Sequence, residues 1–182
     1  MALAAAGTFV IIGAAVAVLM FRRSAPVDET AGESITPETA VQSATIVCYG
    51  DRTMLLENET ITRDKTAIVT SGRCRLTIRN ANLTSPSTTL VASGDSTVTI
   101  DNSTVSGEGA AIIASGNARV RIAGSTVKSE GTGLISSGSS VVNLDNSVLR
   151  GDQLAYIQSG DGRIILSNTK VEGKGTGRAE TR

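Results

Sequence analysis

Hydrophobic positions recur with a 22-residue period between Ala44 and Gly175. Six copies follow one another without insertion, beginning at Ala44, Thr66, Thr88, Ala110, Thr132 and Leu154. Counted within each copy, the eleventh and thirteenth residues are aliphatic or Met and their neighbours are mostly polar, which is the two-residue period of a half-buried strand. One copy is too short to bury its own apolar face, so the pattern predicts coils that stack on one another.

Two positions of the repeat predict turns. The seventh residue is glycine in every copy, which indicates a tight corner with positive φ: Gly50, Gly72, Gly94, Gly116, Gly138 and Gly160. The fifteenth is asparagine in five copies and Gly124 in the fourth, and asparagine tolerates the left-handed conformation of a second corner. Stacked at the ~4.8 Å spacing of strands, these asparagines are expected to form a hydrogen-bonded ladder. The turns and the alternation predict an all-β solenoid over residues 44–175 and exclude a helical repeat.

The apolar residues before each glycine form two adjacent columns, at positions three and four. Neighbouring residues of a strand face opposite sides, so one column must point outward. Position five is mostly small, like position nine across the turn, which places positions three and five inside. Position four is then an outward stripe, about 25 Å long from the strand spacing. It contains Val47, Val69, Val91, Ile113, Ile135 and Ile157.

An exposed, flat, apolar stripe normally marks a contact surface. In this interpretation the stripe binds a protein partner or a second copy of the chain. Two alternatives stay open, namely that the linker or tail covers the stripe, or that both columns are partly buried.

The beginning of the chain predicts a membrane anchor. Residues 2–21 carry no charge, and a helix of that length spans ~30 Å, the thickness of the hydrocarbon core. Arg22 and Arg23 come next, at the level of the headgroups. A cleaved signal peptide is the alternative, but the apolar stretch ends without the small residues that a cleavage site needs. We therefore expect residues 1–23 to be a single-pass transmembrane anchor whose residues 2–21 contact lipid.

Polar segments flank the repeat. Residues 24–43 hold two of the three prolines and four acidic residues, which predicts a flexible linker. Residues 176–182 are expected to be a polar tail. The arginine pair after the anchor favours a cytoplasmic location for the repeat, since basic residues near a span bias the topology that way. One pair is a modest bias, so the side of the membrane stays open.

The amino-acid composition argues against several classes of function. The chain has 17 basic and 17 acidic residues, so its net charge gives no reason to expect nucleic-acid binding. It has no histidine, which excludes Ser-His-Asp and Cys-His catalysis and histidine-ligated zinc. We expect no cofactor and no metal.

The two cysteines fall at one corner of the expected solenoid. Cys48 is the fifth residue of the first copy, and Cys74 is the ninth residue of the second. If both point inward, their Cα atoms lie ~6 Å apart, a distance that suits a disulfide. A disulfide would indicate an oxidising compartment and oppose the topology that the arginine pair favours. Two small buried thiols are the alternative.

A 22-residue coil with three strands, a glycine corner and an asparagine column resembles the right-handed parallel β-helix of the pectin-lyase-like superfamily. More narrowly, the chain is similar to bacterial membrane-anchored proteins with Ser-Gly-Asn or Ser-Gly-Asp coils, as in Ser93-Gly94-Asp95 and Ser115-Gly116-Asn117. The resemblance covers residues 44–175. It is specific for the fold and its handedness and says little about function.

The resemblance also raises the option of an enzyme. Superfamily members that cleave acidic polysaccharides use an aspartate cluster for calcium and an arginine as base. Here the outward acids Glu57, Asp101 and Asp145 lie in alternate copies, ~10 Å apart, too far to share an ion ligated at ~2.3–2.6 Å. We expect no enzymatic activity.

We therefore expect a non-enzymatic, membrane-anchored structural or protein-interaction module that uses the Val/Ile stripe as its contact face. The alternative is a surface domain that binds an anionic polysaccharide through outward arginines that recur in every second copy. These are Arg75, Arg119 and Arg163, with Arg121 beside them.

Overall fold

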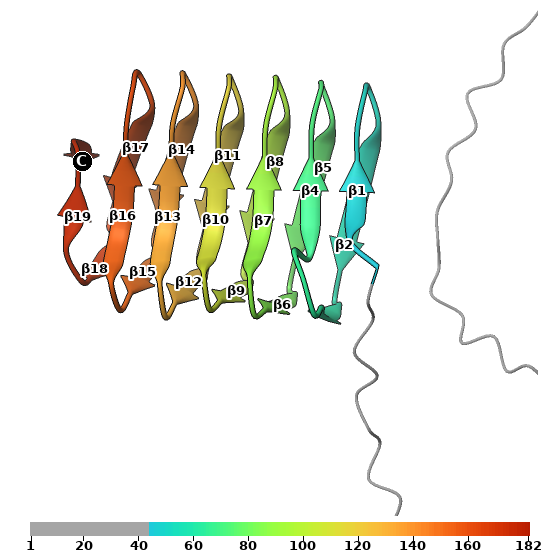
Figure 1. Ribbon diagram of the computed structural model, residues 1–182, viewed down its shortest axis with the longest axis horizontal. Coiled ribbons are helices and arrows are strands. Elements are labelled where there is room, and N and C mark those ends of the chain that lie inside the picture. Colours follow the sequence, from blue (N-terminus) through green and yellow to red (C-terminus); the bar gives the residue numbers. More distant parts are fainter. Residues whose placement is uncertain (1–43) are drawn as a thin grey trace, which may run out of the picture. The chain divides into compact units, whose positions relative to one another are not determined.

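The computed structural model describes residues 44–182, which form a solenoid of parallel strands (Figure 1). Three sheets run along the solenoid, and each coil contributes one strand to each sheet. The expected anchor (1–23) and linker (24–43) lie outside the described residues. No helix in the part that the structure describes is long and apolar enough to cross a membrane.

Sheet A is made by the strands that precede the glycine corners, which lie side by side in Figure 1. They are β1 (Ile46–Cys48), β4 (Ile68–Thr70), β7 (Thr88–Ala92), β10 (Ala110–Ala114), β13 (Thr132–Ser136), β16 (Leu154–Gln158) and β19 (Gly175–Thr176).

Sheet B follows the glycine corners and sheet C follows the asparagine corners. Sheet B contains β2 (Thr53–Glu57), β5 (Arg75–Arg79), β8 (Thr97–Asp101), β11 (Arg119–Ala123), β14 (Val141–Asp145), β17 (Arg163–Ser167) and β20 (Ala179–Thr181). Sheet C contains β3 (Thr60–Thr62), β6 (Asn82–Ser85), β9 (Thr104–Gly107), β12 (Thr126–Ser129), β15 (Val148–Gly151) and β18 (Lys170–Glu172).

The pairing register equals the sequence period. Val98 in β8 pairs with Val120 in β11, which is the equivalent residue of the next copy, and every strand pair from β1 to β18 keeps this offset. The expected all-β solenoid of six coils is therefore confirmed. The register also stacks like residues in columns, because each residue meets its counterpart in the next coil.

The core consists of these stacked aliphatic columns. Ile100, Ile122 and Leu144 at position thirteen are all at most 1% exposed, and positions eleven and eighteen supply parallel columns. Fully burying a side chain of this size stabilises the fold by about 1.5–3 kcal/mol. Because the columns run through all coils, one continuous core results rather than a set of separate small ones.

The turns at positions seven and fifteen of each coil require a residue in the left-handed backbone conformation. The six corner glycines have φ between 61° and 66°, and the five asparagines at position fifteen have φ between 46° and 58°. Stacking adds a second constraint, since a Cβ on Gly94 would lie 2.9 Å from the backbone nitrogen of Gly72. The asparagine ladder is only a fragment: within residues 44–182, one side-chain hydrogen bond joins two asparagines, from Asn80 Nδ2 to Asn58 Oδ1 at 3.3 Å.

A longer ladder lies one residue further, at position sixteen, and is made of the buried serines of the third, fourth and fifth coils. The backbone amide of Ser103 donates to Ser125 Oγ at 3.0 Å, and that of Ser125 donates to Ser147 Oγ at 3.2 Å. Each of these serine hydroxyls in turn donates to the second carbonyl before it in its own coil, at 2.7 Å for Ser125. Buried backbone amides at the corner thus gain acceptors from the next coil.

The two ends of the solenoid differ. The expected polar tail, 176–182, continues sheets A and B through β19 and β20, where the register departs from the repeat: Tyr156 pairs with Gly175, and Ile164 pairs with Ala179. This final lap is shorter than the others and lies over the last coil. At the other end, the inward side chains Ile46 and Met54 are only partly buried.

Candidate interaction surface

The outward face of sheet A carries an apolar stripe. In β7, Leu90 and Ala92 are fully buried and Val91 between them is half-buried, and position four is more exposed than its neighbours in the other strands before the last coil as well. Position four therefore faces outward. Val47 at the first coil is 47% exposed. The remaining members are half-buried: Val69, Val91, Ile113, Ile135 and Ile157.

This face is free of charge over its whole length. No residue at positions one to six of the six coils is Asp, Glu, Lys or Arg. Every charged residue between Ala44 and Gly175 lies at positions eight to twenty-two, on sheets B and C and their corners. The segregation leaves sheet A as the one neutral face among the three sheets.

The serines beside the stripe direct their hydroxyls toward the protein backbone. Ser93 Oγ donates to the Thr70 carbonyl at 3.0 Å, and Ser137 Oγ donates to the Ala114 carbonyl at 3.5 Å. Both serines are at position six and are half-buried. A hydroxyl that already has a backbone partner costs less to desolvate, so the serines extend the surface that another molecule can cover.

A disulfide joins the first two coils at the edge of this face. Cys48 and Cys74 are fully buried and bonded to each other, with their Cα atoms 5.9 Å apart. The equivalent pair one coil later is Thr70 and Ser96, whose hydroxyls are hydrogen-bonded at 3.1 Å. The covalent link therefore occupies a contact that recurs along the solenoid. Arg52, at position nine of the first coil, is instead exposed and stacks on Tyr49 at 4.4 Å.

The outward arginines of sheet B are not equivalent. Arg75, Arg119 and Arg121 are exposed and form no ion pair within residues 44–182. Arg163 is engaged by Glu180 of β20 through two hydrogen bonds of 3.0 Å each. In the register of sheet B, Thr97 separates Arg75 from Arg119. Of the four arginines, Arg75, Arg119 and Arg121 therefore remain available to an anion, because Arg163 is paired.

The outward acids of sheet B are separated as well. Asp101 and Asp145 flank Ala123 in the β8-β11-β14 register, and Arg79 lies 3.6 Å from Asp101. Within the described residues, no group of three or more His, Cys, Asp or Glu is arranged to hold a metal ion.

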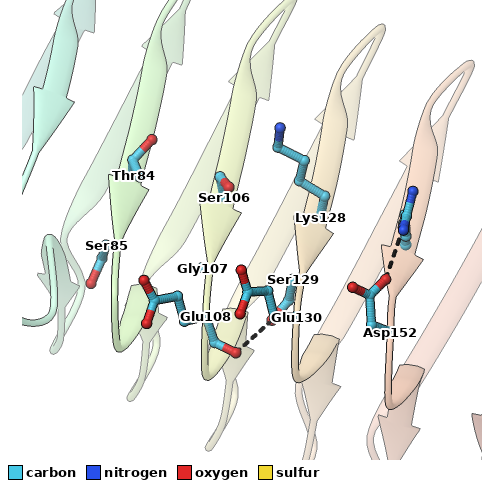
Figure 2. A pocket seen from close by; sticks show the side chains of 10 residues that line it. Thr84, Ser85, Ser106, Gly107, Glu108, Lys128, Ser129, Glu130 and Asp152 are labelled. Atoms are coloured by element: carbon cyan, nitrogen blue, oxygen red, sulfur yellow. Dashed lines mark hydrogen bonds and ion pairs between the residues drawn. The ribbon is translucent and has the colours of Figure 1, made fainter.

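A groove of about 390 Å³ runs along the outer side of sheet C (Figure 2). Glu108, Glu130 and Asp152 follow one side of it in successive coils. Lys128 and Arg150, which are neighbours in the register of sheet C, line it as well. Two of the polar groups of the groove are paired with each other. Arg150 Nε donates to Asp152 Oδ1 at 2.9 Å, which raises the pKa of Arg150.

The floor of this groove is also explained by the fold. Ser129 Oγ donates to the Gly109 carbonyl at 3.1 Å. A Cβ on Gly107 would lie 2.7 Å from the Ala110 carbonyl oxygen, so the small residue there is required by the chain's own bend. Beside the groove, the hydrogen bond from Lys170 lowers the pKa of Glu172. These contacts account for the small residues of the floor and for one ion pair at its edge.

The sequence pattern located the stripe and the arginines, but it missed two features. The first is the absence of charge at positions one to six, which can be read in the sequence once those positions are known to share one face. The second is the pairing of Arg163 with Glu180, which cannot be read in the sequence because β20 lies outside the 22-residue period.

A family model described as right-handed β-helix region matches residues 44–179. No curated protein and no solved structure matches the chain.

Proposed function

The chain belongs to the right-handed β-helix family, and we propose that it uses this fold as a non-enzymatic, membrane-anchored interaction module whose contact face is sheet A. The observation that carries the proposal is the combination of an apolar stripe with a face free of charge over six coils. Contiguous exposed apolar surface is typical of an interaction site.

Energetics favour sheet A over the other two faces. Covering the exposed part of a half-buried Val or Ile removes apolar surface from water and contributes less than about 1 kcal/mol per side chain. The exposed ion pairs of sheets B and C, such as Arg79 with Asp101, contribute about 0–1 kcal/mol each and are weakened by salt. Binding of a partner to sheet A also desolvates no charged side chain of this chain, because positions one to six carry none.

Several observations support a role without catalysis. The outward acids are separated by a neutral residue or paired with an arginine, as Asp101 is with Arg79. In the groove on sheet C, Arg150 is paired with Asp152, and Ser129 donates to a backbone carbonyl. Asp101 and Asp152 are each paired with an exposed arginine on their own surface, which is typical of surface ion pairs.

The disulfide supports a location outside the cytoplasm. Structural disulfides persist in oxidising compartments, and Cys48 and Cys74 are the two cysteines of the chain. Residues 2–21 would supply the anchor. The β-helix would then lie on the non-cytoplasmic side, opposite to the bias of Arg22 and Arg23.

A charge-insertion experiment tests the contact face. Val91→Lys with Ile113→Lys places two charges in the centre of the stripe, and the full-length protein in its membrane should lose its cross-linked complexes. Thr77→Lys with Thr99→Lys adds the same charge to the half-buried outward face of sheet B and serves as the matched control. Thermal unfolding of both variants checks that the solenoid persists. Complexes that survive in the sheet A variant, or disappear equally in both, would contradict the proposal.

A second candidate is binding of an anionic polysaccharide. The observation in its favour is that Arg75, Arg119 and Arg121 are exposed without an ion-pair partner in the described residues. It is the weaker candidate because Arg163, the fourth member, is engaged by Glu180.

A further inference from the structure

We propose that the first coil binds a carboxylate ligand from outside the chain through the buried side chain of Arg63. The inference does not depend on sheet A and goes beyond the proposed function. Arg63 directly follows β3 and is only 7% exposed. Among residues 44–182, its Nε is the one buried side-chain nitrogen or oxygen that has no hydrogen-bond partner.

The repeat makes an arginine at this place exceptional. Arg63 is the twentieth residue of the first coil, and the same position in the later coils holds only serine or glycine. The corner is crowded there, since a Cβ on Gly107 would lie 2.7 Å from the Ala110 carbonyl oxygen. The first coil can hold a long side chain because, within the described residues, another coil packs against one side of it only.

The charge of Arg63 has no compensating carboxylate in the part of the chain that the structure describes. Arg63 forms no ion pair there, and Asp64, the next residue, is exposed. A guanidinium stays protonated in proteins, and a charge that is removed from water without a partner is strongly unfavourable. A bound anion would offset this cost.

The edge of the guanidinium that has no partner fits a carboxylate. Nη1 donates to the Thr62 carbonyl at 3.2 Å, which leaves Nε and Nη2 as the two donors of the opposite edge. Arg163 uses these same two nitrogens to hold the two carboxylate oxygens of Glu180, each at 3.0 Å. A carboxylate accepts two parallel hydrogen bonds from such an edge, whereas chloride cannot.

Charge and packing restrict the ligand further. A carboxylate carries a single negative charge and neutralises the guanidinium, whereas a phosphate dianion would leave excess charge in a buried site. Because Nε is fully buried, binding requires a small displacement of the first coil. This coil is loosely packed, since its inward side chains Ile46, Met54 and Leu56 are only partly buried. A small carboxylate such as acetate is therefore a suitable probe.

Thermal unfolding of the full chain tests the site. Sodium acetate, compared with sodium chloride at equal pH and ionic strength, should raise the unfolding midpoint, because a ligand that binds only the folded state stabilises it. Sodium phosphate should raise it less. Arg63→Met should abolish the shift, and Arg63→Lys should lose most of it, because an ammonium lacks the two-donor edge. Arg73→Met is the matched control and should keep the shift, since Arg73 is exposed and paired with Asp51.

A second measurement observes Arg63 directly and does not require a stable Arg63→Met variant. In ¹⁵N–¹H spectra of the wild-type chain, the Nε resonance that disappears in Arg63→Lys belongs to Arg63. This resonance should move with acetate concentration and reach a plateau. The Nε resonance of Arg73, assigned in the same way from Arg73→Lys, should stay in place.

Four results would overturn the inference. The first is that acetate moves neither the unfolding midpoint nor the Arg63 resonance of the wild-type chain. The second is an acetate shift of the midpoint that persists in Arg63→Met. The third is a larger response to phosphate than to acetate, which would exclude a carboxylate site. The fourth is a response that appears only after the acids Asp28, Glu29, Glu33 and Glu38 are changed to Asn or Gln, because the chain's own carboxylate would then be the partner.

Discussion

Cys48 and Cys74 are bonded across the corner between sheets A and B, with a Cα separation of 5.9 Å. Thr70 and Ser96 stand in the same relation one coil later and form a hydrogen bond instead. A covalent link thus reinforces the first coil, which has a neighbouring coil on one side only within residues 44–182.

Loss of this bond should destabilise the β-helix. Cys48→Ser with Cys74→Ser replaces it by a hydroxyl pair like Thr70 and Ser96, which keeps the corner polar and small. The sequence separation of 26 residues corresponds to a loop-closure contribution of about 3.5 kcal/mol. Urea unfolding should show a loss approaching that value. Wild-type protein treated with a reductant during unfolding should move to the same midpoint, and unchanged stability in the variant would contradict the structural role.

Alanine substitutions at two of the corner glycines should distinguish the cost of backbone strain from the cost of steric clash. Gly50→Ala puts a side chain at φ 66° with no atom within 4 Å of the new Cβ, whereas Gly94→Ala has nearly the same φ and a backbone nitrogen at 2.9 Å. We expect a loss of about 1–2 kcal/mol for Gly50→Ala, from left-handed strain alone. Gly94→Ala should lose clearly more, measured by thermal unfolding. Equal losses would mean that stacking of the corners imposes no steric constraint.

The serine ladder should contribute through the amides it satisfies. Ser125→Ala removes the acceptor of the buried Ser103 amide, and an unpaired buried donor costs about 1–3 kcal/mol. Hydrogen exchange should accelerate at Ser103 in particular. Asn102→Gly at the neighbouring corner keeps the left-handed conformation accessible and should change stability by much less. Similar losses in both variants would mean that the serine hydroxyl contributes no more than the asparagine side chain.

Polyanion binding, if present, should depend on three arginines rather than four. Replacing Arg75, Arg119 and Arg121 by Gln should abolish salt-dependent retention on a polyanion resin. Arg163→Gln should change the elution salt little, because Glu180 already occupies that guanidinium. If wild-type protein is not retained on the resin, the glycan-binding alternative is refuted. If Arg163→Gln alone abolishes retention, the binding set is not limited to Arg75, Arg119 and Arg121.

Different parts of the candidate site were readable from the sequence to different degrees. The stripe from Val47 to Ile157 follows from strand alternation, because the small residues of position five place that position inside and position three with it. The asparagine column was readable as a corner, yet the ladder formed mainly at position sixteen. The left-handed asparagine turns the next residue inward, so the serine hydroxyls rather than the asparagine amides reach the neighbouring coil.

The sequence by itself determined the coil, its three strands, its columns and its register, because in a solenoid every residue contacts its counterpart one period away. The tertiary structure alone decided the arrangement at the point where the period ends. There the final lap is shorter than one repeat, β20 brings Glu180 onto Arg163, and Tyr156 meets Gly175. It also decided between two thiols and a disulfide, since periodicity brings Cys48 and Cys74 to one corner at a distance that suits either state, and only the structure shows them bonded.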